Sequence, residues 1–143
     1  MKLSTKGRYA VMALADLAQE PSNNPTSLKN ISLRQGISLL YLEQLFLKLK
    51  NKEIVYSIRG PYGGYKLSKK PEDIKLSIIF SAVDEEIKTV KCNKKSKRSC
   101  NGKSIKCITH NLWDEVETLI NTFFDNKSLK DVLEINHKME RIN

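Results

Sequence analysis

A glycine turn between two short helical segments, followed at once by a glycine-rich hairpin, constrains the fold of this chain most strongly. Ser27 can cap a helix that ends before Gly36, and Ser38 can cap the next helix after one intervening residue. Residues 54–67 predict two short strands, rich in β-branched and aromatic side chains, around the turn Arg59-Gly60-Pro61-Tyr62-Gly63-Gly64. Two helices joined at a glycine turn and followed directly by a hairpin predict a helix-turn-helix with a wing.

Helices are predicted on both sides of this unit. Ser4 or Thr5 can cap a first helix that ends at Pro21 and carries its apolar residues on one face. Pro71 is expected to open a later helix, whose apolar positions are Ile74, Ile78, Ile79, Ala82 and Val83.

The C-terminal third is also expected to be helical. A wide apolar face runs from Leu112 to Phe124, and Ser128 with Asp131 resembles the capping box of a last helix. The predicted fold class is therefore mainly α with a small β-hairpin wing, in which a winged helix-turn-helix is followed by a long C-terminal helix.

The charge of the chain favours a polyanionic partner. Residues 1–87 carry a net charge of +4, residues 88–106 carry +8 and residues 107–143 carry −3. A basic N-terminal half is typical of nucleic-acid binding, although solvated lysines that only aid solubility are the alternative. No apolar run reaches the roughly 18 residues that a membrane span needs. No apolar segment of a secretory signal follows Lys2, so we expect a cytoplasmic protein with no membrane contact.

The second helix of the predicted helix-turn-helix carries the candidate residues for reading DNA. Side chains near the start of such a helix contact base edges in the major groove. Gln can pair with adenine and Glu can accept a hydrogen bond from cytosine N4. For Glu43 the alternative is a surface ion pair with Lys48 or Lys50. The candidates on this helix are Ser38, Leu40, Tyr41, Glu43, Gln44 and Lys48.

Further DNA contacts are predicted outside that helix. Arg59 at the tip of the wing suits a narrow, electronegative minor groove, and Gly60 lets the backbone approach a phosphate. Lys2, Lys6 and Arg8 lie at the start of the first helix, where they can contact phosphates.

All three cysteines of the chain lie close together in the sequence. Cys92, Cys100 and Cys107 are spaced C-x7-C-x6-C, and His110 follows as C-x2-H. Three thiolates and one imidazole form a four-ligand set for a metal centre, and the basic side chains around them offset its negative charge. Zinc accepts Cys3His, but structural zinc sites usually include a C-x2–4-C pair, which is absent here. The wide spacing favours an iron–sulfur cluster.

Six motifs along the chain occur together in one known family. They are Gly7-Arg8-Tyr9-Ala10, Gln35-Gly36-Ile37-Ser38, Tyr41-Leu42-Glu43-Gln44-Leu45-Phe46, Arg59-Gly60-Pro61-Tyr62-Gly63-Gly64-Tyr65, Ser81-Ala82-Val83-Asp84-Glu85 and Cys107-Ile108-Thr109-His110-Asn111-Leu112-Trp113. This combination resembles the IscR-type iron–sulfur-cluster regulators, a winged-helix repressor family, over essentially the whole chain.

The resemblance implies a homodimeric transcription regulator that binds double-stranded promoter DNA and one 2Fe–2S cluster per chain. It implies repression or activation of genes for cluster assembly and related genes, with a choice of promoters that depends on cluster occupancy. It also implies that Glu43, Gln44 and Arg59 contact DNA, and that the helix from Leu112 to Phe124 forms the dimer. The implied cluster ligands are Cys92, Cys100, Cys107 and His110.

The chain departs from the family pattern at several positions. The spacings between its cysteines are longer than usual, Leu40 replaces a small polar residue, and Tyr62 lies where the family often has glycine. With these departures, we expect three parts. They are a winged helix-turn-helix DNA-binding domain at residues 1–86, a cysteine-containing cluster-binding loop at 87–108 and dimerisation helices at 109–143.

Other functions remain open for the cysteines. They could hold zinc or a 4Fe–4S cluster, or act as a switch for thiol redox state or nitric oxide, while the DNA-binding unit stays the same. A thiol-dependent enzyme could use Cys107 with His110, but no orienting acid or oxyanion-hole signature accompanies them. We therefore do not expect an enzyme.

Overall fold

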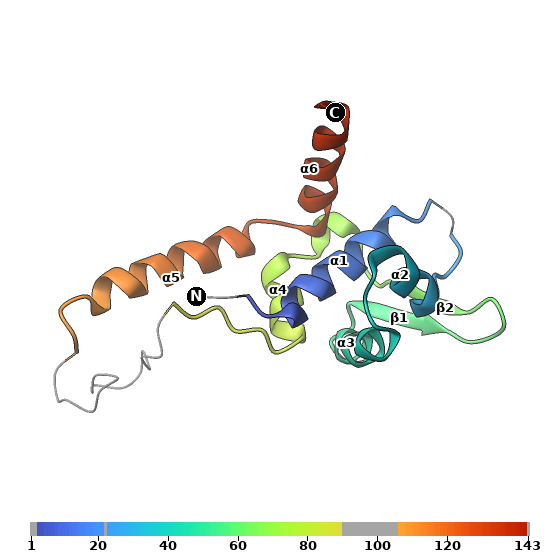
Figure 1. The fold of residues 1–143 in the computed structure, drawn as a ribbon, viewed down its shortest axis with the longest axis horizontal. Coiled ribbons are helices and arrows are strands. Elements are labelled where there is room, and N and C mark those ends of the chain that lie inside the picture. The colour runs from blue at the N-terminus through green and yellow to red at the C-terminus, as the bar shows by residue number, and fades with distance from the viewer. Residues whose placement is uncertain (1–2, 22, 90–105, 143) are drawn as a thin grey trace.

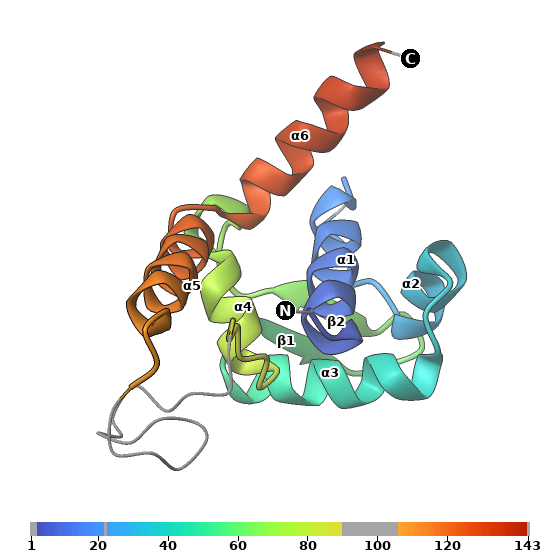
Figure 2. The same ribbon diagram turned by 60° about the vertical axis from the view of Figure 1, so that its left-hand side comes forward.

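The computed structural model describes residues 3–21, 23–89 and 106–142, and its regular elements within these are helices and one antiparallel hairpin. In Figures 1 and 2, helix α1 lies across α2, α3 and the hairpin, while α5 and α6 project away from this body. The predicted fold class is confirmed. The elements are α1 (Thr5–Gln19), α2 (Leu28–Gln35), α3 (Leu39–Asn51), β1 (Val55–Ile58), β2 (Gly64–Leu67), the 3-10 turn η1 (Pro71–Asp73), α4 (Leu76–Ala82), α5 (His110–Asp125) and α6 (Leu129–Ile142).

Serine caps fix where the first three helices begin. The hydroxyl oxygen of Ser4 accepts a hydrogen bond from the backbone N–H of Lys6, and Ser27 and Ser38 cap α2 and α3 in the same way. Gly36 ends α2 in the left-handed conformation, with φ of 65°, which a residue with a side chain rarely adopts. The starts that the sequence predicted for these three helices are confirmed.

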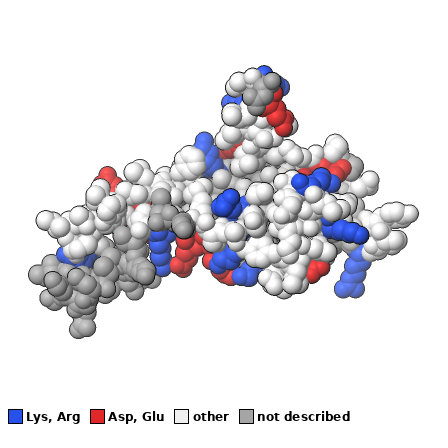
Figure 3. All heavy atoms as spheres, viewed as in Figure 1, with Lys and Arg blue, Asp and Glu red and all other residues white. Residues whose placement is uncertain are grey.

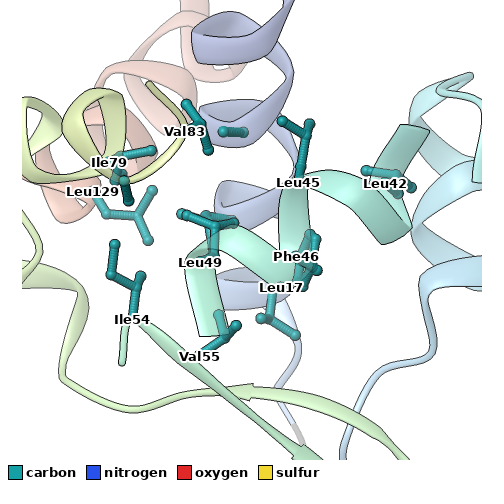
Figure 4. Packing of buried hydrophobic residues seen from close by; sticks show 14 of the residues in the cluster. Leu17, Leu42, Leu45, Phe46, Leu49, Ile54, Val55, Ile79, Val83 and Leu129 are labelled. Carbon is teal, nitrogen blue, oxygen red and sulfur yellow. The ribbon is translucent and has the colours of Figure 1, made fainter. Parts of the chain in front are cut away.

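One apolar core holds the winged helix together and includes the first turn of α6. Figure 4 shows buried side chains from α1, α3, β1 and α4 turned towards one another, with Leu129 of α6 among them. Phe46 and Leu129 are completely buried. The ring of Phe46 packs edge-on against Tyr65 of the hairpin, with 5.0 Å between ring centroids. The start of α6 is therefore part of the same core as α3.

The helix predicted to begin at Pro71 and run through Val83 is wrong as a single helix. Residues 71–73 form only a 3-10 turn, and α4 begins later, at Leu76. Between them, the carbonyl of Ile74 accepts from the N–H of Leu129, and the N–H of Leu76 donates to the carbonyl of Lys127, both at 2.9 Å. This pairing with the segment before α6 keeps residues 74 and 75 extended. As a result, Ile78 is exposed rather than in the core.

The hairpin is attached to the loop that follows α1. Thr26 and Tyr65 exchange two backbone hydrogen bonds, of 3.0 and 2.8 Å. A Cβ atom on Gly64 would lie 2.4 Å from the carbonyl carbon and oxygen of Thr26, so this approach requires glycine. The attachment fixes the direction of the wing relative to α3.

Candidate nucleic-acid interface and metal centre

The α3 helix has one buried face and one exposed face. Leu42, Leu45, Phe46 and Leu49 are buried, whereas Leu40, Glu43 and Gln44 are exposed. The structure therefore brings the predicted base-reading side chains together on the free face of α3.

Tyr41 is held at the start of α3 by helix α1. Its ring contacts Tyr9 edge-on at 5.8 Å, and its hydroxyl lies 3.1 Å from the Oγ1 atom of Thr5. These contacts orient the N-terminal end of α3, the end that carries Ser38 and Gln44, against α1. Residues of both helices line an open hollow of about 430 Å³ there.

The lysines that could have paired with Glu43 are engaged elsewhere. The Nζ atom of Lys48 lies 2.8 Å from a carboxylate oxygen of Asp84, and Lys50 donates to the hydroxyl of Ser57 at 2.9 Å. Within residues 3–21, 23–89 and 106–142, Glu43 has no ion pair. The carboxylate of Glu43 is thus available to a ligand, while Lys48 is paired with Asp84.

Among the residues predicted to contact DNA from the wing or to contact its phosphates, some are exposed and one is already hydrogen-bonded within the protein. Arg59, Gly60 and Tyr62 are exposed at the tip of the hairpin, and Gly60 has a φ of 123°. Arg8 is exposed, whereas the Nζ atom of Lys6 donates to the backbone carbonyl of Asp84 at 3.1 Å. Lys2 lies outside the described residues. On the face drawn in Figure 3, Lys and Arg side chains are spread over the winged helix with Asp and Glu side chains between them.

Asp84 and Glu85 connect the end of α4 to two other helices. Asp84 adopts a left-handed backbone with φ of 57°, and its hydrogen bond from Lys48 of α3 holds the pKa of its carboxyl below the ordinary value. Glu85 is buried and accepts hydrogen bonds from the backbone N–H groups of Ser4 and Gly7, at 3.0 and 3.2 Å, and from the Ser4 hydroxyl. Burial raises the pKa of the Glu85 carboxyl, but these hydrogen bonds outweigh it, so the pKa is lowered.

Thr89, the last described residue before the first two cysteines, is attached to α5. Its backbone N–H donates to the Oε2 atom of Glu117 at 3.2 Å, and its hydroxyl donates to the carbonyl of Trp113 at 3.0 Å. Segment 84–89 therefore spans from α3 to α5. Sequence reasoning gave no role to Glu117 and placed Asp84 and Glu85 only within a motif, because their partners are distant in the chain.

Half of the predicted ligand set lies at the start of α5. Cys107 is exposed and free, and His110 is the first residue of α5 and is largely buried. The backbone N–H of His110 donates to the carbonyl of Cys107 at 3.0 Å, so one turn brings the two residues together. Cys92 and Cys100 lie outside the described residues. A thiol and an imidazole three residues apart at the start of one helix are of the types that a metal centre with sulfur and nitrogen ligands takes.

Thr109 lies between these two ligand candidates and was not singled out from the sequence. Its Oγ1 atom is 3.1 Å from the indole nitrogen of Trp113 and 3.7 Å from the sulfur of Cys107. The four-residue spacing between Thr109 and Trp113 could have identified Thr109, because residues four apart lie on the same face of a helix.

The α5 helix leaves an apolar stripe uncovered. Phe124 packs against Phe80 of the body at 4.7 Å between ring centroids, which fixes one end of the helix. Along the other side, described side chains remain exposed by 39–65%. They are Leu112, Trp113, Leu119 and Phe123. Within the described residues, no helix has the length and apolar character to cross a bilayer.

Comparisons with known proteins agree over nearly the whole chain. The family model Rrf2, described as an iron-dependent transcriptional regulator, matches residues 3–135. The HTH-type transcriptional regulator IscR of Aliivibrio salmonicida (strain LFI1238) is 47% identical over 133 residues, which cover 93% of this chain and 77% of that protein. IscR of Vibrio cholerae serotype O1 is 44% identical over 140 residues, which cover 98% of this chain and 79% of the relative.

Solved structures give the same result for the fold. T. potens IscR is similar with a TM-score of 0.74 at 36% identity, covering 95% of this chain and 88% of that one. CymR, the global cysteine regulator of B. subtilis, is similar with a TM-score of 0.78 at 32% identity, covering 94% of this chain and 98% of that one.

Proposed function

The chain belongs to the Rrf2 family of iron-dependent transcriptional regulators, as an IscR-type DNA-binding regulator and not an enzyme, and from this premise we propose that it senses iron–sulfur cluster status. It binds one 2Fe–2S cluster per chain and controls genes for cluster assembly and related genes. The observation that carries the proposal is the exposed free thiol of Cys107 one turn from His110, at the start of a helix joined to the winged helix.

Cys92, Cys100, Cys107 and His110 hold the cluster in this proposal. When bound, the cluster supplies a one-electron redox centre whose presence depends on the supply of iron and sulfide. The chain's part is to provide three thiolates and a neutral imidazole, and to connect them to the helices that contact DNA. The eight lysines and arginines of residues 88–106 offset the negative charge of the loaded site.

In the proposed DNA complex, the exposed face of α3 enters the major groove and the wing reaches the adjacent minor groove. Arg59 and Gly60 contact the minor groove and its phosphates, and Lys2, Lys6 and Arg8 contact phosphates beside α1. Lys48 reaches DNA when it releases Asp84. The residues proposed to read bases are Ser38, Leu40, Tyr41, Glu43 and Gln44.

A homodimer places two such surfaces on one promoter. The exposed apolar stripe of α5 supports this proposal, because burying Leu112, Leu119 and Phe123 against a second copy removes apolar surface from water. With this dimer, residues 1–86 bind DNA, residues 87–108 bind the cluster and residues 109–143 form the dimer. Leu129 is an exception, because it belongs to the core of the DNA-binding part. A regulator of bacterial promoters acts in the cytoplasm, where we place this protein.

Segment 84–89 offers a route by which cluster occupancy reaches the DNA. Its first two residues contact α3 and α1, and Thr89 contacts α5 immediately before the segment that carries Cys92 and Cys100. We propose that ligation of those cysteines shifts the balance between the Lys48–Asp84 ion pair and a Lys48 contact with DNA. Cluster-free protein keeps its fold and selects other DNA sites.

A second candidate keeps the DNA-binding unit but changes the sensor. The similarity to CymR, which is named as a global cysteine regulator, supports this second candidate. It indicates that one fold serves regulators of different signals. In this candidate, the exposed thiol of Cys107 takes part in a zinc site, a 4Fe–4S cluster or a redox or nitric-oxide switch.

Metal analysis of anaerobically isolated protein tests the proposed function against this alternative. We expect about two irons and two sulfides per chain, together with visible absorbance, because a 2Fe–2S centre contains both. Zinc gives no visible absorbance, and a 4Fe–4S cluster doubles the iron content. Protein that stays iron-free after chemical reconstitution would contradict the proposal.

A further inference from the structure

We propose that Thr109 is a positioning residue that donates its hydroxyl hydrogen to the sulfur of Cys107 and thereby raises the reduction potential of the cluster. In this arrangement, the indole of Trp113 holds the hydroxyl in the required orientation. The inference rests on the proposed function, because it needs Cys107 to be a cluster ligand.

The direction of the two hydrogen bonds follows from the chemistry of the donors. An indole N–H can only donate, so Thr109 Oγ1 accepts from Trp113 across their 3.1 Å contact. The single hydrogen of the hydroxyl is then free for another acceptor. The sulfur of Cys107, 3.7 Å away, carries no hydrogen when it is a ligand thiolate. Thr109 must therefore be the donor, and the order is Trp113 to Thr109 to Cys107.

The position of Thr109 on the helix supports this assignment. Thr109 is the N-cap of α5, where a threonine hydroxyl usually accepts a hydrogen bond from a backbone N–H of the first turn. Here the side chain makes no such capping bond. Its hydroxyl is turned instead towards Cys107 and Trp113, so α5 lacks a stabilising cap at the end that carries the ligands.

The expected consequence is electrostatic. Reduction adds one electron to the cluster from an external donor and forms or breaks no bond to the protein. The added negative charge is shared by the ligand sulfurs, so a hydrogen bond to Cys107 stabilises the reduced state more than the oxidised state. Loss of the hydroxyl should therefore make the cluster harder to reduce.

A spectroscopic redox titration of the full chain with its cluster tests the inference. In Thr109→Val, the ratio of reduced to oxidised cluster at the wild-type midpoint potential should fall about three- to tenfold, and tenfold corresponds to ~59 mV for one electron. Thr109→Ser keeps the hydroxyl and should titrate like the wild type. An unchanged potential in Thr109→Val, or a loss in Thr109→Ser as large as in Thr109→Val, would overturn the proposal.

A second readout needs no cluster. Trp113 is the only tryptophan of the chain, so its indole N–H gives one assignable NMR signal. In cluster-free protein, this signal should shift in Thr109→Val and stay in place in Thr109→Ser. A signal that does not move in Thr109→Val shows that the Trp113–Thr109 hydrogen bond is absent and overturns the inference alone. A wild-type protein that never takes up iron overturns the proposed function.

Discussion

Anaerobically isolated Cys107→Ala protein is expected to show no visible absorbance and to retain less than a tenth of the wild-type iron. The substitution removes one of three thiolates from the proposed ligand set, and the remaining ligands cannot complete the coordination of the cluster. Cys107 is exposed, so its loss removes no core packing. The far-ultraviolet circular dichroism and the thermal unfolding of the cluster-free proteins should therefore coincide with those of wild type.

The neighbouring residue provides a matched control for this experiment. Ile108 is fully exposed and carries no ligand atom, so Ile108→Ala should keep both iron and colour. Full iron content in Cys107→Ala would remove this residue from the ligand set. Equal loss in both variants would show that the turn before α5, rather than the thiol, is what the cluster requires.

Arg34→Ala is expected to lower the free energy of unfolding by about 3 kcal/mol, a large part of the stability of a small domain. The side chain of Asp16 is only 4% exposed. Its two carboxylate oxygens share the single Nε–H of Arg34, and the carboxylate also accepts a hydrogen bond of 2.6 Å from Arg34 Nη2 and one from the Gln35 side-chain amide. The hydrogen bond with Asp16 also raises the pKa of the Arg34 guanidinium further above its already high value. Without Arg34, the carboxylate stays buried with one amide partner.

Urea unfolding of three variants checks this prediction. Asp16→Ala should cost less than Arg34→Ala, about 1.5–3 kcal/mol, because the guanidinium left behind is 44% exposed and can be solvated. Lys29→Ala, on the exposed side of the same helix, should change stability by less than about 0.5 kcal/mol. If Arg34→Ala cost no more than Lys29→Ala, this ion pair would not hold α2 against α1.

The parts of the fold that sequence predicts well are those set by neighbours in the chain. Ser27, Gly36 and Ser38 act on backbone groups within a few residues of themselves, so the helix-turn-helix follows from local chemistry. The Ser128 and Asp131 capping box is confirmed for the same reason, with the N–H of Ser128 donating to Asp131 at 2.8 Å. Hydrogen bonds from Ser128 hold the pKa of Asp131 below its ordinary value.

The parts that sequence misses depend on contacts between distant segments. Ile74 and Lys75 have helical neighbours, but they pair with residues 127–129, more than fifty positions later, and periodicity cannot indicate such pairing. Asp84 and Glu85 look like a solvated acidic pair, and only the folded chain places them against Lys48 and Ser4. At the start of α5, the spacing of Cys107 and His110 predicted that one helical turn joins them, as the hydrogen bond from the His110 N–H to the Cys107 carbonyl shows, whereas the orientation of Thr109 needed the structure.

The fold alone does not decide which signal the protein senses. Its winged helix is shared with CymR as well as with IscR. The residues of the proposed sensor follow segment 84–89, which Glu85 attaches to α1 and Thr89 attaches to Glu117 of α5. The choice between an iron–sulfur cluster and another ligand therefore depends on the thiolates and the imidazole. In the proposed mechanism, segment 84–89 transmits their effect to the helices that contact DNA.

DNA-site selection with and without the cluster tests most directly whether cluster occupancy reaches the DNA-binding helices. One preparation selects duplexes from a randomised library, first with its cluster and then after the cluster has been removed without air. We expect two different sets of selected sites, with Cys107→Ala selecting the cluster-free set in both cases. Identical sets with and without cluster, at equal salt concentration, would contradict the claim that cluster occupancy reaches the helices that contact DNA.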